Sequence, residues 1–213
     1  DLCLECKGCK AECPSGVDMA KLKYEFLNQY NKANRIPWRA RIFADINRLN
    51  LIGCRLAPIS NWVAGNFISK WMMHWLLGVH ARRRFPPLAR QTLPDWFRSR
   101  PKQCHATKGK VVLFNDTFMN YNYPSVGIAA VELLERQGLE VSLADPVCCG
   151  RPMISKGMLE RATAHARRNV EMLHRYVEAG AVIVGCEPSC LLTLRDEYPD
   201  LLGDERSRTV ARN

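Results

Sequence analysis

The chain has 213 residues, a formal net charge of +10 and an ordinary apolar content, so we expect a folded protein rather than a disordered tail. No uncharged apolar run is long enough to cross a bilayer, and we see no targeting segment. Ten cysteines without a secretory signal predict a cytoplasmic protein, because clustered thiols in a reducing compartment usually bind metal.

The first motif is CLECKGCKAECP, from Cys3 to Pro14. Its spacing, C-x2-C-x2-C-x3-C-P, is typical of bacterial ferredoxins, in which thiolates bind [4Fe–4S] clusters and the fourth cysteine ligates the other cluster of a pair. We therefore expect Cys3, Cys6 and Cys9 to bind one cluster and Cys13 to serve a second, whose other ligands lie upstream. A structural zinc site is the main alternative. A disulfide framework is disfavoured by the missing secretory signal.

The sequence begins at Asp1 inside this cluster motif, and we expect it to be a piece of a longer protein. Residues 1–32 would then be the C-terminal half of a ferredoxin-type region. Asp18 is a suitable N-cap for a helix from Met19 to Asn31. Leu22, Phe26 and Tyr30 give this helix an apolar stripe that we expect to pack on the cluster motif.

Residues 33–107 are predicted to be a basic helical connector that contains all five tryptophans. From Arg35 to Lys110 there are fifteen Lys and Arg residues against two acids, Asp45 and Asp95. Such a patch is either a solvated face or a surface that docks on something anionic. Arg82–Arg84 indicate a solvated corner, and no nucleic-acid-binding module is recognisable.

Residues 61–79 carry large apolar side chains at near-helical spacing, among them Trp62, Phe67, Trp71 and Trp75. A basic, Trp-rich amphipathic helix is typical of a peripheral membrane contact, here on the inner membrane. The alternative is a helix that packs on a neighbouring domain of the same parent protein. Trp and Met at helical spacing are more often core, which favours this second interpretation.

The pattern changes at residue 108, and we predict a truncated α/β domain over residues 108–213. Its expected strands are Lys110–Asn115, Leu139–Ala144 and Ala181–Val184. Helices are expected over Val126–Gln137, from about Ser155 to Ala179, and from Cys190 onward with Ser189 as its cap. Strands that alternate with helices at these lengths predict a partial Rossmann-like parallel sheet.

Two cysteine pairs follow these strands, Cys148–Cys149 and Cys186 with Cys190. In an open parallel sheet, ligands bind beyond the carboxyl ends of the strands, so the four thiols are expected at one rim. A metal or cluster site is the functional interpretation. Buried free cysteines, as we expect for Cys54 and Cys104, or a metal-free redox thiol pair are the alternatives.

The pieces VCCGRP (Val147–Pro152) and GCEPSC (Gly185–Cys190) resemble the CCG cysteine-rich domain of heterodisulfide reductases and related iron–sulfur proteins. Together with the N-terminal motif, they resemble the C-terminal part of large FAD-linked oxidases of the D-lactate or D-2-hydroxyglutarate dehydrogenase type. The resemblance implies that electrons pass from FAD through [4Fe–4S] clusters to a quinone or carrier. The FAD-binding region of the same parent protein is then the expected partner.

Two departures from the family pattern bear on the second site. Thr117 stands where the family has an upstream cysteine, and the last pair is spaced C-x3-C instead of C-x2-C. Zinc, a simpler cluster held by four cysteines, or a site that has lost its metal therefore remain open, with Asp116 as a further oxygen ligand for zinc. The five histidines form no constellation, and we see no acid/base residue. We therefore expect the substrate site on the missing part and no catalysis by this chain alone.

Overall fold

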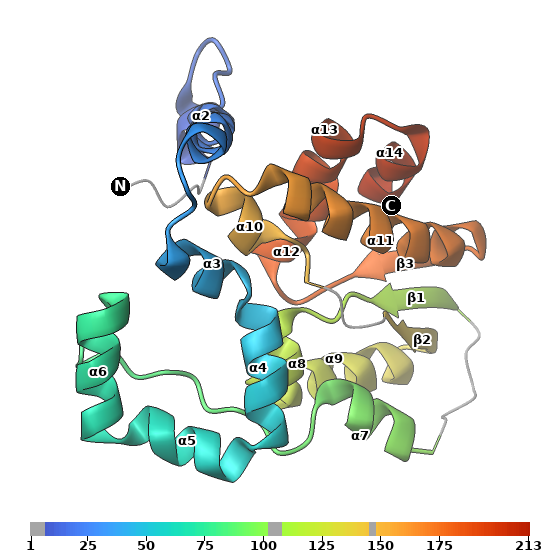
Figure 1. Ribbon diagram of the computed structural model, residues 1–213. Coiled ribbons are helices and arrows are strands. Elements are labelled where there is room, and N and C mark those ends of the chain that lie inside the picture. Colours follow the sequence, from blue (N-terminus) through green and yellow to red (C-terminus); the bar gives the residue numbers. More distant parts are fainter. Residues whose placement is uncertain (1–6, 102–107, 145–147) are drawn as a thin grey trace.

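The computed structural model describes residues 7–101, 108–144 and 148–213 (Figure 1). Its elements, in chain order, are α1 Gly8–Glu12, α2 Met19–Ala33, α3 Trp38–Ala44, α4 Ile46–Arg55, α5 Ala57–Gly65, α6 Phe67–Leu77, α7 Leu93–Ser99, β1 Gly109–Leu113, α8 Thr117–Tyr121, α9 Pro124–Arg136, β2 Leu139–Leu143, α10 Arg151–Ser155, α11 Leu159–Glu178, β3 Ala181–Val184, α12 Pro188–Leu192, the π-helical segment η1 Thr193–Glu197, α13 Tyr198–Leu202 and α14 Glu205–Arg212.

A parallel sheet with the strand order β2-β1-β3 lies at the centre of the fold. Val111 of the central strand pairs with Val141 on one side and with Val182 on the other. Each crossover between these strands contains helices, as parallel neighbours require. The predicted α/β class with a partial parallel sheet is confirmed, and so are the three strands to within a residue or two at their ends.

Helices cover both faces of the sheet (Figure 1). Successive residues of a strand point to opposite faces, and the core divides accordingly. Val112 and Phe114 pack with residues of α11, α13 and α14, including Leu173. Val111 and Leu113 pack on the other face against α7, α8 and α9. The β-branched run that follows Lys110 is therefore buried on both sides, which explains its uninterrupted apolar sequence.

The N-terminal helix α2 packs on the turn between α10 and α11. Asp18 caps it as predicted, because its side chain accepts a hydrogen bond of 2.9 Å from the backbone N–H of Lys21. The predicted packing face is wrong, since Leu22, Phe26 and Tyr30 are all more than half exposed. The face formed by Ala20 and Tyr24 is buried instead, where small and amphipathic side chains meet Met153 and Ile154.

Two helix boundaries also differ from the prediction. The helix expected over residues 61–79 is two helices, because Asn66 adopts an extended conformation and its side chain caps Ile68 at the start of α6. The helix expected from Ser155 begins instead at Leu159, after the left-handed turn at Gly157. In the part of the chain that the structure describes, no helix is long and apolar enough to cross a membrane.

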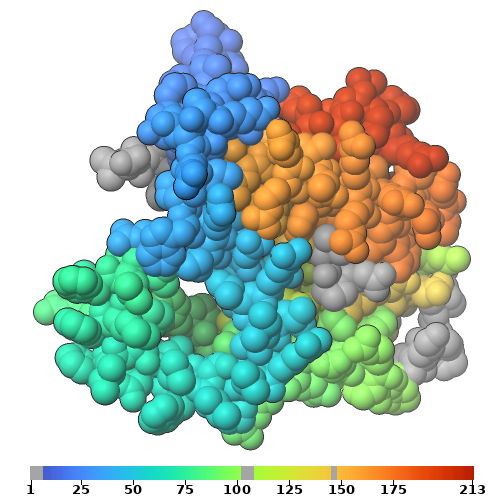
Figure 2. Space-filling view, in the orientation of Figure 1, coloured from blue at the N-terminus to red at the C-terminus, as the bar shows by residue number. Residues whose placement is uncertain are grey.

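The helices α3 to α6 lead away from the sheet and return through residues 78–92. Figure 2 shows α5 and α6 as a teal and green lobe at one corner of the molecule. Many large apolar side chains of α5 and α6 are exposed there. The side chains of this lobe are therefore available for contact with something outside the described chain.

Gly157 offers a test of how tightly α2 is docked. Its φ is +65°, and a Cβ placed there would lie 2.6 Å from the carbonyl carbon of Leu27. Gly180 has a φ of +79° but open space around it. We expect Gly157→Ala to lower the free energy of unfolding by about 3 kcal/mol, from left-handed strain and overpacking together. Gly180→Ala should cost only about 1–2 kcal/mol, from the strain alone. Urea denaturation of both variants measures the difference, and equal losses would mean that α2 is not held against this turn.

Candidate functional site

Three cysteines from two loops meet at the carboxyl edge of the sheet. Cys148 and Cys149 lie in the loop after β2, and Cys190 lies in α12, after β3. The sulfur atoms of Cys149 and Cys190 are 3.1 Å apart. These thiols line a cavity of about 470 Å³, which we call the thiol pocket; its lining is Ile46, Thr117, Phe118, Cys148, Cys149, Arg151, Pro152, Ser155, Glu187, Ser189 and Cys190.

Thr117 occupies the position in this pocket that the family pattern gives to a cysteine. It is buried, and Asn47 donates a hydrogen bond of 2.9 Å to its hydroxyl oxygen. The Thr117 hydroxyl also interacts with the Cys148 thiol. The hydroxyl therefore lines the pocket wall without adding a fourth sulfur to the pocket.

Cys186 does not line the thiol pocket. The residue as a whole is exposed. Partial burial of its thiol raises the pKa of Cys186 most, and the negative charge of Asp116 raises it further. Asp116, considered above as an oxygen ligand, caps α8 by accepting hydrogen bonds from the backbone N–H groups of Phe118 and Met119 at 2.8 and 3.0 Å. Burial is the largest influence on the pKa of Asp116 and raises it, whereas these two hydrogen bonds lower it. Three of the four predicted thiols are thus together, and the fourth lies apart.

The two central thiols favour their protonated forms. Hydrogen bonding to Cys149 is the largest cause that raises the pKa of Cys148 well above its ordinary value, and burial adds to it. The hydrogen bond to Cys148 lowers the pKa of Cys149, but the hydrogen bond with Cys190 and burial together raise it by more. Any metal bound here would have to displace these protons.

A buried polar cradle holds the backbone of the Cys148–Cys149 loop. The Tyr198 hydroxyl donates to the carbonyl oxygen of Cys149 at 2.9 Å. The Asn169 side-chain amide donates to the Tyr198 hydroxyl at 2.7 Å and to the carbonyl oxygen of Cys148 at 3.2 Å. His165 lies 3.2 Å from the same Cys148 oxygen. The sequence patterns did not identify these three residues as functional. The available signal was the four-residue spacing of His165 and Asn169, which places both on the inner face of α11.

The N-terminal motif is described from Lys7 onward, so Cys3 and Cys6 lie outside the described residues. Cys9 is exposed and Cys13 is partly exposed. Backbone N–H groups of Val17 and Ser15 hydrogen-bond the Cys13 sulfur and lower its pKa. A sulfur that accepts such bonds is suited to act as a thiolate ligand. We call residues 7–13 the cluster loop.

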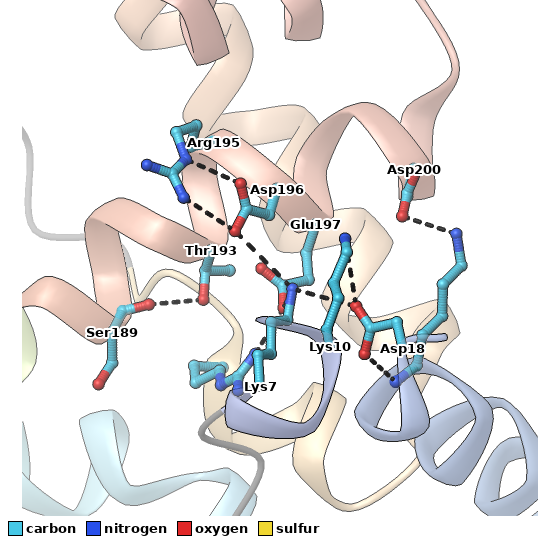
Figure 3. Close-up of polar contacts among 11 residues, drawn as sticks. Lys7, Lys10, Asp18, Ser189, Thr193, Arg195, Asp196, Glu197 and Asp200 are labelled. Atoms are coloured by element: carbon cyan, nitrogen blue, oxygen red, sulfur yellow. Dashed lines mark hydrogen bonds and ion pairs between the residues drawn. The ribbon is translucent and has the colours of Figure 1, made fainter. Parts of the chain in front are cut away.

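The buried carboxylate of Glu197 faces Lys7 of the cluster loop (Figure 3). Its Oε1 atom is 2.7 Å from Lys7 Nζ and 2.7 Å from Arg151 Nη1. Lys7 belongs to the cluster loop and Arg151 lines the thiol pocket. Nothing in the sequence pattern singled out Glu197, because an isolated glutamate in a helical stretch is usually solvated.

The cysteine thiols of the pocket are the kind of ligand that iron–sulfur clusters and zinc require. Across residues 7–101, 108–144 and 148–213, however, no group of three or more His, Cys, Asp or Glu side chains is arranged to hold a metal ion. The chemistry of the ligands fits, and the described arrangement is not a preformed coordination shell.

The helix that carries Cys190 begins differently from the prediction. Ser189 was expected as its cap, but Glu187 is the N-cap and accepts a hydrogen bond from the backbone N–H of Ser189 at 3.2 Å. Pro188 takes the first helical position, where a missing N–H costs nothing. The predicted cap is wrong because the helix starts two residues earlier than expected.

A larger groove adjoins the thiol pocket. It has a volume of about 990 Å³ and is lined mainly by α4, α5, α6 and the segment after α6. Ile46, Phe118 and Pro152 line both cavities. These shared side chains lie between the groove and the thiols.

Residues 111–195 match the CCG family of cysteine-rich domains. The domain resemblance predicted from the sequence is confirmed. The residues matched run from the central strand to the helical segment after Cys190, so they include most of the sheet and every lining residue of the thiol pocket except Ile46.

Curated relatives extend the likeness beyond this domain. The chain is 29% identical over 188 residues to the C subunit of anaerobic glycerol-3-phosphate dehydrogenase of Escherichia coli (strain K12), covering 87% of this chain and 46% of that protein. It is 26% identical over 219 residues to D-2-hydroxyglutarate dehydrogenase of the same strain, covering 96% of this chain and 21% of that protein. Lactate utilization protein A of Exiguobacterium sp. is 38% identical over 97 residues, which are 45% of this chain and 38% of that protein.

The chain therefore spans less than half the length of each of these relatives. No solved structure matches it significantly. The similarity to dehydrogenase components covers nearly the whole chain, whereas the CCG match covers only the α/β part.

The polar cradle can be tested at Tyr198, which is fully buried. Tyr198→Phe removes one hydroxyl that both donates to the Cys149 oxygen and accepts from Asn169, so two buried groups lose a partner. We expect the free energy of unfolding to fall by about 1–3 kcal/mol. Tyr123→Phe is the matched control, since Tyr123 is 47% exposed and should change stability by less than about 0.5 kcal/mol. Urea titration of both variants checks this, and a neutral Tyr198→Phe would exclude the cradle as a support of the loop.

Proposed function

We propose that this chain is the iron–sulfur electron-transfer portion of a flavin-dependent 2-hydroxy-acid dehydrogenase. The observation that carries the proposal is the convergence of three thiols in one pocket at the carboxyl edge of a CCG-type sheet. The similarity to D-2-hydroxyglutarate dehydrogenase along 96% of the chain supports the class of substrate. An electron-transfer role also agrees with the similarity to one component of anaerobic glycerol-3-phosphate dehydrogenase.

The cysteines are assigned as follows in this proposal. Cys148, Cys149 and Cys190 hold a metal or cluster in the thiol pocket, and Cys186 completes the set from the adjacent rim. The ferredoxin-type ligands are Cys3, Cys6, Cys9 and Cys13. An iron–sulfur cluster, when bound, supplies one-electron transfer at a potential set by its surroundings.

The chain's own residues position these thiols and limit the access of water. Tyr198 and Asn169 fix the carbonyl groups of the Cys148–Cys149 loop, so the two sulfurs leave the backbone in fixed directions. Phe118 and Pro152 form the apolar wall of the thiol pocket. Desolvation of a cluster site is one of the levers by which a protein tunes potential.

We divide the chain into three functional parts: residues 1–32 as the ferredoxin-type half, residues 33–107 as the basic connector, and residues 108–213 as the CCG-type domain. FAD and the 2-hydroxy acid belong on the FAD-binding region of the same parent protein. The acceptor, a quinone or a carrier, is assigned to the groove beside the thiol pocket. The three side chains shared by the two cavities support that assignment because they keep the separation short.

Two alternatives come from other functional classes. In the first, zinc bound by the thiol pocket stabilises a docking module that has no redox role. In the second, the thiols take part in disulfide chemistry like that of heterodisulfide reductase. Iron, zinc and sulfide content distinguish these alternatives from the proposal.

The metal assay uses chain purified without oxygen, in parallel with Cys149→Ser and Cys54→Ser. We expect iron and acid-labile sulfide in the parent chain and a clear loss of both in Cys149→Ser, because one ligand of a buried cluster is removed. Cys54→Ser should keep the full content, since Cys54 is buried away from the thiol pocket and donates to the Tyr121 carbonyl oxygen.

The opposite results have distinct meanings. Zinc that disappears in Cys149→Ser, with iron unchanged, would establish the structural-zinc alternative at the thiol pocket. If the parent chain contains no iron, zinc or acid-labile sulfide, only the alternative of disulfide chemistry at the thiols would remain.

We further propose that the lobe formed by α5 and α6 rests on an anionic membrane surface. The lobe patch consists of Ile59, Trp62, Val63, Phe67, Ile68, Trp71, Met72, Trp75 and Leu76, all of which are exposed. Basic residues flank it: Lys70 is on α6, Arg82–Arg84 follow, and Arg39 reaches the end of α6 at Gly78. Apolar side chains with surrounding cations and few acids favour a charged lipid surface. This would make the protein cytoplasmic and peripheral to the inner membrane.

Vesicle sedimentation tests this surface. We expect Trp71→Ala combined with Trp75→Ala to weaken binding to phosphatidylserine-containing vesicles by about tenfold or more, because two large interfacial side chains are lost. Leu133→Ala, at an exposed apolar position on α9, should have no effect. Binding should also fall as salt rises. If the parent chain does not bind these vesicles at all, the FAD-binding region becomes the better candidate for the lobe patch.

A further inference from the structure

We propose that Glu197 is a positioning residue that ties the cluster loop to the thiol pocket and sets the charge between them. The inference rests on the proposed electron-transfer function. It adds a specific residue that holds two predicted ligand segments in one arrangement. The contacts of Glu197 with Lys7 (Figure 3) and with Arg151 carry it.

The contacts at this carboxylate are short and shielded. The side chain of Glu197 is 1% exposed, and those of Lys7 and Arg151 are 19% and 21% exposed. Both cations lie 2.7 Å from the same oxygen atom, Oε1, while Oε2 is buried without a hydrogen-bond partner among the described residues. A carboxylate in this setting is held in place by its two cations, since an unpaired buried charge is strongly disfavoured.

The two cations belong to the two ligand segments. Lys7 is adjacent in sequence to Cys6 and two residues before Cys9, and Arg151 is two residues after Cys149. Glu197 itself comes seven residues after Cys190, at the end of the π-helical segment. One carboxyl group therefore connects backbone stretches that carry thiols from three separate parts of the chain.

The backbone at Lys7 supports a functional reason for its position. Lys7 is the only residue other than glycine with a positive φ, +60°, among the described residues. A non-glycine residue is disfavoured in this conformation and persists only where its surroundings hold it there. The ion pair with Glu197 is such a hold, and glycine at this position would remove the strain but also the cation.

Other contacts between the N-terminal segment and the CCG-type domain act at different places. Lys21 of α2 pairs with Asp200 at 2.6 Å, but both side chains are more than 40% exposed. Asn31 donates to the Lys156 carbonyl oxygen at 2.8 Å. Further acids near Lys7 are Asp18 and Asp196, each at 3.9 Å. By comparison, the ion pair of Lys7 with Glu197 is both short, at 2.7 Å, and buried on the Glu197 side.

Hydrogen exchange of the purified chain tests the link without any bound cluster. We expect the amides of residues 8–18 to exchange about tenfold faster in Glu197→Gln, because the neutral amide no longer holds Lys7. Asp200→Asn is the matched control: it breaks an exposed pair between the same two parts and should change exchange by less than about twofold. Lys7→Met removes the more exposed partner of the same ion pair. It should speed the exchange of residues 8–18 to a similar extent, even if Glu197→Gln does not fold.

Redox titration of the cluster-loaded protein gives the second readout. Removing the negative charge in Glu197→Gln should raise the midpoint potential, and removing the positive charge in Lys7→Met should lower it. A purely structural role would move both variants in the same direction. Shifts of opposite sign support the proposal.

The outcomes separate this inference from the proposed function. If Glu197→Gln or Lys7→Met leaves exchange as slow as in the parent chain, or if Asp200→Asn has the same effect, Glu197 is not the link and the inference is overturned. If no iron or sulfide binds, the proposed function fails, and the exchange experiment still decides whether Glu197 holds the loop.

Discussion

The buried carboxylate of Glu197 is the constraint on which the relation between the two cysteine regions depends. A charge at 1% exposure is unfavourable unless paired, and removal of one partner from a buried pair typically costs about 3–5 kcal/mol. The exposed pair of Lys21 with Asp200 contributes only about 0–1 kcal/mol. The ion pair with Glu197 is therefore an interior contact of the cluster loop, whereas the exposed pair at the surface adds little. The same pair brings a Lys and an Arg close to the predicted ligands, so packing and electrostatics act through one group.

The direction in which Glu197 points follows from a local irregularity of the helix. The segment from Pro188 to Leu202 is continuous but becomes π-helical between Thr193 and Glu197. Pro199 supplies the physical reason: it has no N–H for the carbonyl of Arg195, and its ring crowds that turn. The turn widens, and the Tyr198 N–H reaches the carbonyl oxygen of Thr193, five residues back. Glu197 and Tyr198 are both buried as a result, one toward the cluster loop and the other toward the Cys149 carbonyl.

Local patterns predicted much of this fold. The β-branched strands, the Asp18 cap and the parallel arrangement could be recognised because each depends on neighbouring residues or on a well-known crossover rule. The packing face of α2 could not, since Leu22, Phe26 and Tyr30 form the better stripe and only the shape of the α10–α11 turn selects Tyr24 instead. Three thiols of the rim were foreseen from the topology. Glu197 gains its role from contacts between distant segments, for which the sequence carries no local signal.

The electrostatics of the thiol pocket bear on which chemistry it can support. A metal-free redox pair needs one thiol with a lowered pKa, usually beside a free cation or at a helix N-terminus. Here the hydrogen bond to Cys149 and burial raise the pKa of Cys148. The hydrogen bond to Cys148 lowers the pKa of Cys149, but the hydrogen bond with Cys190 and burial raise it by more. The nearby Arg151 is engaged by Glu197. The helix that carries Cys190 places a carboxylate, Glu187, at its N-cap. Cys148 and Cys149 are thus poor nucleophiles by themselves, and a bound cation is what would favour their deprotonated form. On this ground we favour the proposed metal or cluster site over disulfide exchange.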